Sequence, residues 1–347
     1  MKPVFDINVR QYQPLPTPLE IRKSIPTTDQ ISEKVSHWRR QIIDILFGES
    51  PRLLVIVGPC SIHDTDAGLE YARRLKAISD RIEDRVMIVM RAYFEKPRTS
   101  VGWKGLIMDP NLDGSCNLDL GLRKARSFLR DLIEVGLPTA TELLDPITPQ
   151  YIADLICWSA VGARTTESQI HRQMASGLSM PLGFKNTTSG NVEAAINAIK
   201  AASQPMTFMG INVAGQASEI STGGNPHCHI ILRGGDAGPN YSQSDVKNCL
   251  DKLSANRLPA SVTIDCSHAN SGKEAEAQPH VFREVLAMKS SGLSAIKALM
   301  LESNICEGSQ HLPRPPSTLL YGVSITDACL GWEKTEELLT EAYSLLG

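Results

Sequence analysis

The sequence predicts an α/β fold, a (β/α)8 TIM barrel with an N-terminal extension and an inserted β-hairpin. The first observation is an alternation of eight short apolar runs with helical patterns from residue 52 onward. The second is composition: 42% hydrophobic but only 5% aromatic residues give the aliphatic core that buried parallel strands prefer. The third is length, because 347 residues is long for one domain and barrels of about 250 residues are the usual exception. Alternation alone also fits an open, doubly wound sheet.

The eight apolar runs are the expected barrel strands. They are short and lead into polar or charged residues. They cover residues 53–57, 86–90, 138–141, 160–163, 181–184, 229–232, 262–265 and 298–301. The expected helices cover residues 69–78, 118–135, 151–158, 169–178, 192–202, 246–253, 281–288 and 336–346. Strict alternation of this kind predicts a parallel sheet that closes into a barrel.

Two segments lie outside the alternation. Residues 1–27 carry five prolines and are expected to form an extended arm; a helix capped at 27–29 should follow and run to residue 47. We therefore divide the chain into an arm and helix for assembly or regulation, 1–50, and a catalytic barrel, 51–347. Residues 207–222 predict a hairpin that turns at Val213-Ala214-Gly215, which is a candidate regulatory or assembly insert at about 205–223.

Composition limits the partners of the chain. A net charge of -3 gives no global basic field, so neither nucleic acid nor an anionic membrane is an expected partner. No apolar run is long enough to span a membrane, and the first ten residues lack the pattern of a signal peptide. The eight cysteines contain no CxxC pair and are expected to be reduced thiols, which favours the cytoplasm.

The carboxyl ends of the strands of such a barrel line one mouth, where active sites lie. The predicted strand ends bring eight chemically active residues to this mouth. Any one of them alone would be a solvated strand end, but four cations and four acids or metal-ligand types together indicate a site. They are Cys60, Arg91, Glu142, Arg164, Lys185, Arg233, His268 and Glu302.

The cations predict an anionic substrate. Arg91, Arg164, Lys185 and Arg233 suit a small molecule that carries both a carboxylate and a phosphate. The segment Lys96-Pro97-Arg98-Thr99 follows the second strand and offers donors to a second phosphate. No GxGxxG fingerprint or P-loop is present, so a nucleotide is not expected.

The remaining strand ends predict a metal site. Cys60, His268 and Glu302 end strands that become neighbours when the barrel closes, and Asp327 follows the last strand. A thiolate, an imidazole and two carboxylates suit one Mn²⁺, Fe²⁺, Co²⁺ or Zn²⁺ ion, whereas Ca²⁺ and Mg²⁺ avoid thiolates. Cys60 alone would be interpreted as a buried core thiol. His63 and His171 are expected to be structural or surface residues.

These segments resemble a known family, the type I 3-deoxy-D-arabino-heptulosonate 7-phosphate (DAHP) synthases. The resemblance covers nearly the whole chain in order. It is carried by GPCSIHD at 58–64, RAYFEKPRT at 91–99, GLIMDP at 105–110, GARTTES at 162–168, ILRGG at 231–235, DCSH at 265–268 and ESN at 302–304. It implies condensation of phosphoenolpyruvate with erythrose 4-phosphate, the first step of the shikimate pathway.

The resemblance also implies residue roles. Metal ligands are expected at Cys60, His268, Glu302 and Asp327. Phosphoenolpyruvate is expected to be held by Arg91, Arg164, Lys185 and Arg233. Gly162 and Ala163 lend backbone to phosphoenolpyruvate, and Glu142 lies beside it. Lys96, Pro97, Arg98, Thr99 and Asp327 contact erythrose phosphate. Lys96 is the candidate proton donor to the developing alkoxide, and His268 or a carboxylate handles the attacking water.

Two departures from the family pattern leave room for altered substrate affinity or regulation, and one insert bears on regulation. Thr187-Thr188-Ser189-Gly190 stands where many relatives have Gly-Thr-Asp-Gly, and Asp236 stands where lysine is common. In the family the arm and hairpin help to form a dimer contact and a pocket for an aromatic amino acid. The hairpin resembles the tyrosine-sensitive branch, because Gly210 stands where the phenylalanine-sensitive branch has serine. The resemblance implies that this glycine leaves space for a tyrosine ring and its hydroxyl group. The residues implied around the pocket are Asp145, Pro149, Ser179, Phe208 and Gly210.

The resemblance therefore predicts a homodimer or homotetramer that an aromatic amino acid inhibits, most of all tyrosine. Two alternatives stay open from the sequence. One is a related sugar-phosphate synthase that uses phosphoenolpyruvate, and the other is an amino-acid sensor without activity on the same barrel. A turnover assay with both substrates separates the three.

Overall fold

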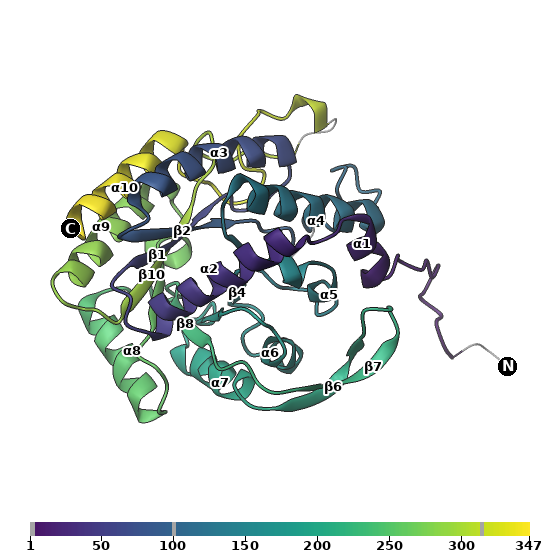
Figure 1. Cartoon of the computed structure of the whole chain (residues 1–347), viewed down its shortest axis with the longest axis horizontal. Coiled ribbons are helices and arrows are strands. Elements are labelled where there is room, and N and C mark those ends of the chain that lie inside the picture. The colour runs from purple at the N-terminus through teal and green to yellow at the C-terminus, as the bar shows by residue number, and fades with distance from the viewer. Residues whose placement is uncertain (1–3, 99–101, 313–315) are drawn as a thin grey trace.

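The fold is a closed parallel barrel, as predicted, and not an open sheet. The computed structural model describes residues 4–98, 102–312 and 316–347. In these residues the barrel order is β1-β10-β9-β8-β5-β4-β3-β2, with every neighbouring pair parallel (Figure 1). The strands are β1 Leu53–Gly58, β2 Val86–Arg91, β3 Thr139–Glu142, β4 Trp158–Val161, β5 Leu182–Lys185, β8 Cys228–Leu232, β9 Val262–Asp265 and β10 Ile296–Glu302.

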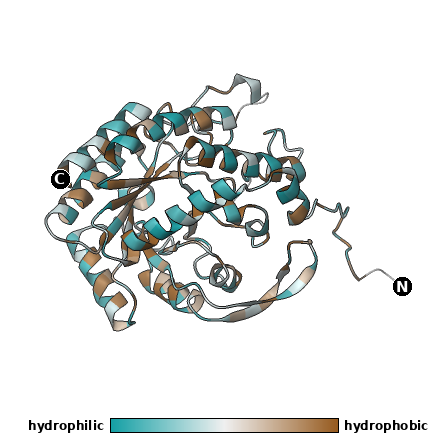
Figure 2. Cartoon of the chain, in the orientation of Figure 1, coloured by the Kyte–Doolittle hydropathy of each residue, from teal (hydrophilic) through white to brown (hydrophobic). Residues whose placement is uncertain are grey.

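The barrel strands form the core because they are covered on both faces. Every residue of β1, with the sequence LLVIVG, is buried, and so is every residue of β2. Figure 2 shows hydrophobic strands at the centre and hydrophilic residues on the outer helices. Burial on both faces explains why the strands read in the sequence as continuous apolar runs and not as an alternation.

Helices follow the strands around the outside of the barrel, and the last helix follows β10. They are α3 Thr65–Ile82, α4 Leu118–Val135, α5 Pro149–Ile152, α6 Gln169–Ser176, α7 Val192–Ala202, α8 Gln243–Ala255, α9 Gln278–Ser290 and α10 Trp332–Leu345. Two of the expected helices, 118–135 and 192–202, have the predicted bounds. None of the helices in the described ranges is long and apolar enough to cross a membrane.

The helix expected at 151–158 was wrong. α5 ends at Ile152, a 3-10 turn covers Ala153–Leu155, and Trp158 begins β4. The backbone N–H of Cys157 donates to the carbonyl of Thr139 at 2.9 Å, so pairing with β3 takes this apolar segment into the sheet. As a result β4 begins and ends two residues earlier than expected, and Gly162 and Ala163 lie in the following loop.

The N-terminal arm is not extended throughout. Residues Pro18–Ser24 form helix α1, which begins with a capping box between Thr17 and Glu20. Helix α2, Asp29–Phe47, runs from its cap at Thr28 to Gly48 as predicted. Arg39 of α2 donates to the carbonyls of Ala153 and Ile156, which precede β4. Helix α2 therefore covers the amino-terminal end of the barrel, opposite the mouth (Figure 1).

The predicted hairpin is confirmed. Strands β6 Met206–Ile211 and β7 Ala217–Thr222 pair antiparallel outside the barrel (Figure 1). The turn closes where Gly215, at φ +73°, donates to the carbonyl of Asn212 at 2.9 Å. At the base, Ser176 of α6 and Thr222 share a hydroxyl hydrogen bond of 2.7 Å. At the tip, Leu19 of α1 donates to the carbonyl of Val213 at 2.8 Å, so the arm and the hairpin are in contact.

His229 of β8 predicts an acid-sensitive fold. Its ring is buried beside Phe47 and Trp158, and burial lowers its pKa to about 3. A lowered pKa means that the neutral form stabilises the fold above pH ~6.5 and that this contribution is lost as the pH falls toward 3. Relative to pH 7, we expect a loss of ~2 kcal/mol at about pH 5 from this group. Denaturant unfolding at both pH values should show a smaller loss in His229→Phe; an equal loss would contradict this assignment.

Candidate active site

The predicted residues converge on one cavity at the carboxyl ends of the strands. Its volume is about 630 Å³. Cys60 and Arg91 are fully buried beside it, and Thr99 lies outside the described residues. The predicted residues that line the cavity are Lys96, Pro97, Arg98, Glu142, Gly162, Ala163, Arg164, Lys185, Arg233, His268, Glu302 and Asp327.

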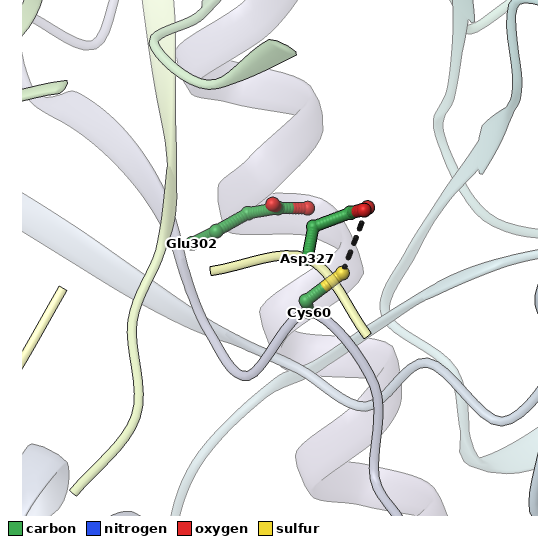
Figure 3. A group of neighbouring side chains, drawn as sticks. All are labelled: Cys60, Glu302 and Asp327. Atoms are coloured by element: carbon green, nitrogen blue, oxygen red, sulfur yellow. Dashed lines mark hydrogen bonds between the residues drawn. The ribbon is translucent and has the colours of Figure 1, made fainter. Parts of the chain in front are cut away.

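A group of three candidate metal ligands lies at this mouth (Figure 3). Cys60, Glu302 and Asp327 each offer a ligand atom, and these atoms all lie within 4.8 Å of one another. The Cys60 thiol donates to Asp327 Oδ2 at 3.4 Å. Burial, reinforced by Glu302, raises the pKa of Cys60 to about 11, so the thiol is protonated as long as no metal ion is bound. One thiol and two carboxylates fit a Mn²⁺, Fe²⁺, Co²⁺ or Zn²⁺ ion, whose binding would displace the thiol proton.

His268, the fourth predicted ligand, is not part of this compact group. Its Nδ1 lies 3.0 Å from Asp265 Oδ2 and 2.7 Å from Ser267 Oγ. It nevertheless lines the same cavity. Burial raises the pKa of Asp327, but Lys96 and then His268 lower it to a net value below the ordinary one. The histidine is therefore close enough to act on the group electrostatically.

Lys96 joins the metal group to the loop after β2. Its Nζ donates to the Cys60 sulfur at 2.9 Å and to the Cys60 carbonyl at 3.2 Å. Burial opposes its charge, but Cys60, Glu302 and Asp327 raise the pKa of Lys96 above its ordinary value. The side chain is therefore held protonated beside the candidate metal ligands.

The cationic side of the cavity is built from residues at or just after the carboxyl ends of separate strands. Lys185 Nζ lies 3.1 Å from Asp265 Oδ2 and 3.9 Å from Glu142 Oε2. Arg164 is exposed at the rim, and burial lowers the pKa of Arg233. Gly162 is needed here, because a Cβ at this position would lie 2.3 Å from the Glu142 carboxylate.

Arg91 lies deeper than the other cations. Its Nη2 donates to Glu302 Oε1 at 2.8 Å, and its guanidinium lies 4.1 Å from the centre of the Tyr93 ring. Among the described residues, Arg91 Nη1 has no acceptor although it is buried. A buried donor without a partner favours an anion at this point.

With this geometry in place, comparison with known proteins decides the family. The model of the DAHP synthetase I family matches residues 24–340. The chain belongs to this family. It is 52% identical to the Tyr-sensitive phospho-2-dehydro-3-deoxyheptonate aldolase of Escherichia coli K12, over 97% of this chain and 95% of the relative. It is 51% identical to the Trp-sensitive enzyme of Enterobacter agglomerans, over 94% of each chain.

The fold of this DAHP synthetase I family member is also that of a solved relative. The phospho-2-dehydro-3-deoxyheptonate aldolase of Francisella tularensis SCHU S4 superposes with a TM-score of 0.95 at 43% identity, over 98% of both chains. The Phe-sensitive enzyme of Escherichia coli K12 is 49% identical over 97% of this chain and 95% of its own length. Relatives sensitive to three different amino acids thus have similar identities, and identity alone does not choose the effector.

The segments that depart from the family pattern are ordered at the rim. Thr187 and Ser189 share a hydroxyl hydrogen bond of 2.9 Å, and Asn191 N donates to Thr187 Oγ1 at 3.0 Å. Thr188 and Asp236 line the cavity. Hydrogen bonds from hydroxyl groups therefore stabilise the loop at residues 187–191, and Lys185 before it still lines the cavity.

Sequence analysis missed two buried carboxylates. Asp265 is fully buried at the end of β9, and Glu95 is buried directly before Lys96. Burial raises the pKa of Asp265, but Lys185 and His268 hold it well below its usual range. Burial, and then Asp145, raise the pKa of Glu95 to about 8. Both stand inside family segments, RAYFEKPRT and DCSH, and a strand-end acid was the available signal for Asp265.

The predicted regulatory residues lie away from the cavity lining. Asp145 lies between β3 and α5, Pro149 begins α5, and Ser179 is exposed between α6 and β5. Phe208 and Gly210 are partly buried in β6. The space expected beside Gly210 is occupied, because a Cβ there would lie 2.5 Å from the end of the Ile220 side chain.

Proposed function

We propose that this chain condenses phosphoenolpyruvate with D-erythrose 4-phosphate and water to give DAHP and phosphate, and that the residues of the barrel mouth carry this reaction. The observation that carries the proposal is the single cavity of about 630 Å³, in which cations from separate strands meet a thiol and two carboxylates. Two phosphorylated substrates need such a cluster because the net charge of the chain is -3. Membership of the DAHP synthetase I family supports this reaction over the other two readings.

Phosphoenolpyruvate is assigned to the side of the cavity that holds Arg164, Lys185 and Arg233. These cations, with Arg91 below them, would bind its phosphate and carboxylate. Gly162 and Ala163 line the same wall and lend backbone. The Glu142 carboxylate lies 3.9 Å from Lys185 and would orient its ammonium group.

Erythrose 4-phosphate is assigned to the loop after β2. Pro97 stiffens this loop, and Arg98 is fixed by a 3.0 Å hydrogen bond from its Nε to the Trp103 carbonyl. Arg98 is exposed at the rim, with Thr99 next in sequence for the same phosphate. Asp327 would lie at the aldehyde end of this substrate.

A division of the cavity between two substrates predicts opposite kinetic effects at two arginines. Arg164→Ala is expected to raise the KM for phosphoenolpyruvate far more than that for erythrose 4-phosphate, and Arg98→Ala to do the reverse. Loss of a charge-assisted hydrogen bond costs ~1.5–3 kcal/mol, which is about tenfold to over a hundredfold in affinity. Steady-state kinetics with each substrate varied in turn measures both effects. Equal effects on both substrates in either variant would show that the division is wrong.

One divalent metal ion is assigned to Cys60, Glu302 and Asp327, with His268 as a fourth ligand. The three grouped ligand atoms fit the predicted choice of Mn²⁺, Fe²⁺, Co²⁺ or Zn²⁺. When bound, the ion supplies a Lewis acid that polarises the erythrose aldehyde.

Lys96 is assigned as the proton donor of the reaction. The raised pKa of Lys96 keeps the proton on Nζ. Its hydrogen bonds to Cys60 hold this nitrogen beside the proposed metal ligands, where the aldehyde would bind. As the enol carbon of phosphoenolpyruvate attacks, the alkoxide that forms takes this proton. Water then adds to the cationic carbon that is left on phosphoenolpyruvate, and phosphate leaves. The proton of this water is assigned to a carboxylate of the cavity, because a His268 that binds the metal ion has no free lone pair.

Feedback inhibition by an aromatic amino acid is assigned to the region where the arm, the hairpin and α5 meet. Arg22 of α1 donates to the Gln150 carbonyl at 2.7 Å, and Tyr151 donates to the Pro16 carbonyl at 2.9 Å. Glu95 then connects this region to the active site. It accepts from the N–H of Asp145 at 3.3 Å and from Thr148 Oγ at 3.2 Å, and it directly precedes Lys96.

Tyrosine is expected to inhibit more strongly than phenylalanine or tryptophan. Deletion of residues 1–20 removes part of α1, and Ser179→Phe fills an exposed position near the hairpin base; both should relieve inhibition and keep the uninhibited turnover. Gly210→Ser requires Ile220 to shift and should favour phenylalanine. Inhibition curves for the three amino acids test this. Absence of inhibition at millimolar levels would leave the arm and hairpin with assembly alone.

A homodimer or homotetramer is proposed because the arm and hairpin leave apolar side chains in solvent. Val4 is 95% exposed, Phe5 81% and Met209 95%. A second copy of the chain would cover this surface. The unpaired state of all eight cysteines, which lie within the described ranges, supports the expected reducing compartment, the cytoplasm.

A further inference from the structure

Asp265 stands between the two halves of the proposed active site. It is fully buried at the carboxyl end of β9. Its Oδ2 lies 3.1 Å from Lys185 Nζ and 3.0 Å from His268 Nδ1. Its Oδ1 accepts from Ser267 Oγ at 2.6 Å and from Ser267 N at 3.1 Å. One carboxylate therefore faces a cation assigned to phosphoenolpyruvate and a histidine assigned to the metal.

The protons around Asp265 determine which nitrogen of His268 is protonated. Ser267 Oγ lies 2.6 Å from Asp265 Oδ1 and 2.7 Å from His268 Nδ1, but it has one proton to give. An ionised carboxylate is the stronger acceptor and carries no proton, so the hydroxyl proton goes to Asp265. His268 Nδ1 then faces two oxygens, Ser267 Oγ and Asp265 Oδ2, and only a protonated Nδ1 can bond to either.

It follows that in the neutral ring Nε2 of His268 carries the free lone pair. His268 lines the cavity, and a metal ion needs an unprotonated nitrogen. The backbone at His268 is held in an uncommon conformation, with φ +60°, in the left-handed region that residues other than glycine seldom adopt. Its carbonyl accepts from Lys273 N at 2.6 Å, which fixes the peptide in this conformation.

We propose that Asp265 is a positioning residue that holds His268 in its Nδ1-protonated form and holds the Lys185 ammonium in place, so that one buried carboxylate supports both metal binding and phosphoenolpyruvate binding. A carboxylate behind a ligating histidine fixes the tautomer and the ring orientation. The inference rests on the proposed roles of His268 and Lys185. It adds a residue to the site that touches neither substrate.

The first test measures binding, without turnover, in Asp265→Asn. The amide keeps the shape but removes the negative charge and turns one acceptor oxygen into a donor. An NH2 group in the place of Oδ2 opposes both Lys185 and protonated Nδ1 of His268, and one in the place of Oδ1 opposes the N–H of Ser267. Mn²⁺ binding to metal-free protein should weaken about 10–100-fold. Phosphoenolpyruvate binding to the Mn²⁺-loaded protein should weaken by about tenfold or more. Asp251→Asn, which removes an exposed carboxylate on α8 away from the cavity lining, is the matched control and should bind Mn²⁺ and phosphoenolpyruvate like the wild type.

The outcomes separate this inference from the metal proposal. The proposed metal site fails if wild-type protein binds no Mn²⁺, or if Cys60→Ala binds Mn²⁺ as well as the wild type does. If wild-type protein binds Mn²⁺ better than Cys60→Ala and Asp265→Asn binds both Mn²⁺ and phosphoenolpyruvate as well as the wild type, the role of Asp265 is overturned.

The second test needs no stable variant of Asp265. In metal-free wild-type protein with ¹⁵N-labelled histidine, the His268 resonances should show a protonated Nδ1 and an unprotonated Nε2. His268→Gln identifies these resonances by their loss. A neutral His268 protonated on Nε2 would overturn the proposal, because Ser267 would then have to donate to the ring and not to Asp265.

Discussion

Removal of the metal is expected to abolish turnover, and Mn²⁺ or Co²⁺ should restore it. Cys60→Ala is expected to lose both metal and activity while the protein stays folded. The reason is the composition of the group: Cys60 supplies its one sulfur ligand, and Glu302 and Asp327 supply its carboxylates. Without the thiolate, the group offers only hard carboxylate oxygens and one ligand fewer. Its affinity for Mn²⁺, Fe²⁺, Co²⁺ or Zn²⁺ should therefore fall.

The control for this result is a cysteine elsewhere in the barrel. Cys228 is also buried on a barrel strand, but it begins β8, at the end away from the mouth. Cys228→Ala removes the same sulfur atom and should keep metal and turnover. Metal content per chain and turnover of the chelated protein are the measurements. Full activity in thoroughly demetallated protein would end the hypothesis.

The barrel could be predicted because its strands are covered on both faces. An element such as β1 then appears as a short uninterrupted apolar run, and its length and its place between helical patterns indicate a strand. Helical spacing of apolar residues was misleading at 151–158, where buried residues of a helix and of a strand were assigned to one helix. A long-range hydrogen bond between Cys157 and Thr139 decides that segment, and local periodicity does not contain it. Helix α1 was missed although its capping box, Thr17 to Glu20, is a local signal.

The residues of the site that could be predicted are those at strand ends and those in segments that resemble the family. Strand ends placed Lys185 and Arg233 at one cavity because the carboxyl ends of parallel strands meet there. The sequence could not reveal what stands behind the lining residues. Asp265, at the end of β9, contacts Lys185 at the end of β5 and His268 in the loop that follows β9. The contact with Lys185 depends on how the strands align in the barrel, which the sequence pattern does not contain.

The largest effect of a single proton donor is expected at Lys96. Lys96→Gln should lower kcat by about 10²–10⁴-fold, the usual contribution of general acid catalysis, and change the KM for phosphoenolpyruvate little. The proton is lost from a nitrogen that lies 2.9 Å from the Cys60 sulfur. Lys96→Arg separates charge from proton transfer, since guanidinium keeps the positive charge but is not deprotonated in proteins.

Lys96→Arg should therefore stay as slow as Lys96→Gln if Lys96 gives up a proton in the reaction. Recovery of kcat by arginine would assign Lys96 a purely electrostatic role beside Glu302 and Asp327. Because Lys96 also bonds to Cys60, the metal content of each variant must be measured and saturated before kcat is compared. A kcat for metal-saturated Lys96→Gln within about threefold of wild type, far below the general-acid range, would remove Lys96 from the proton transfer altogether.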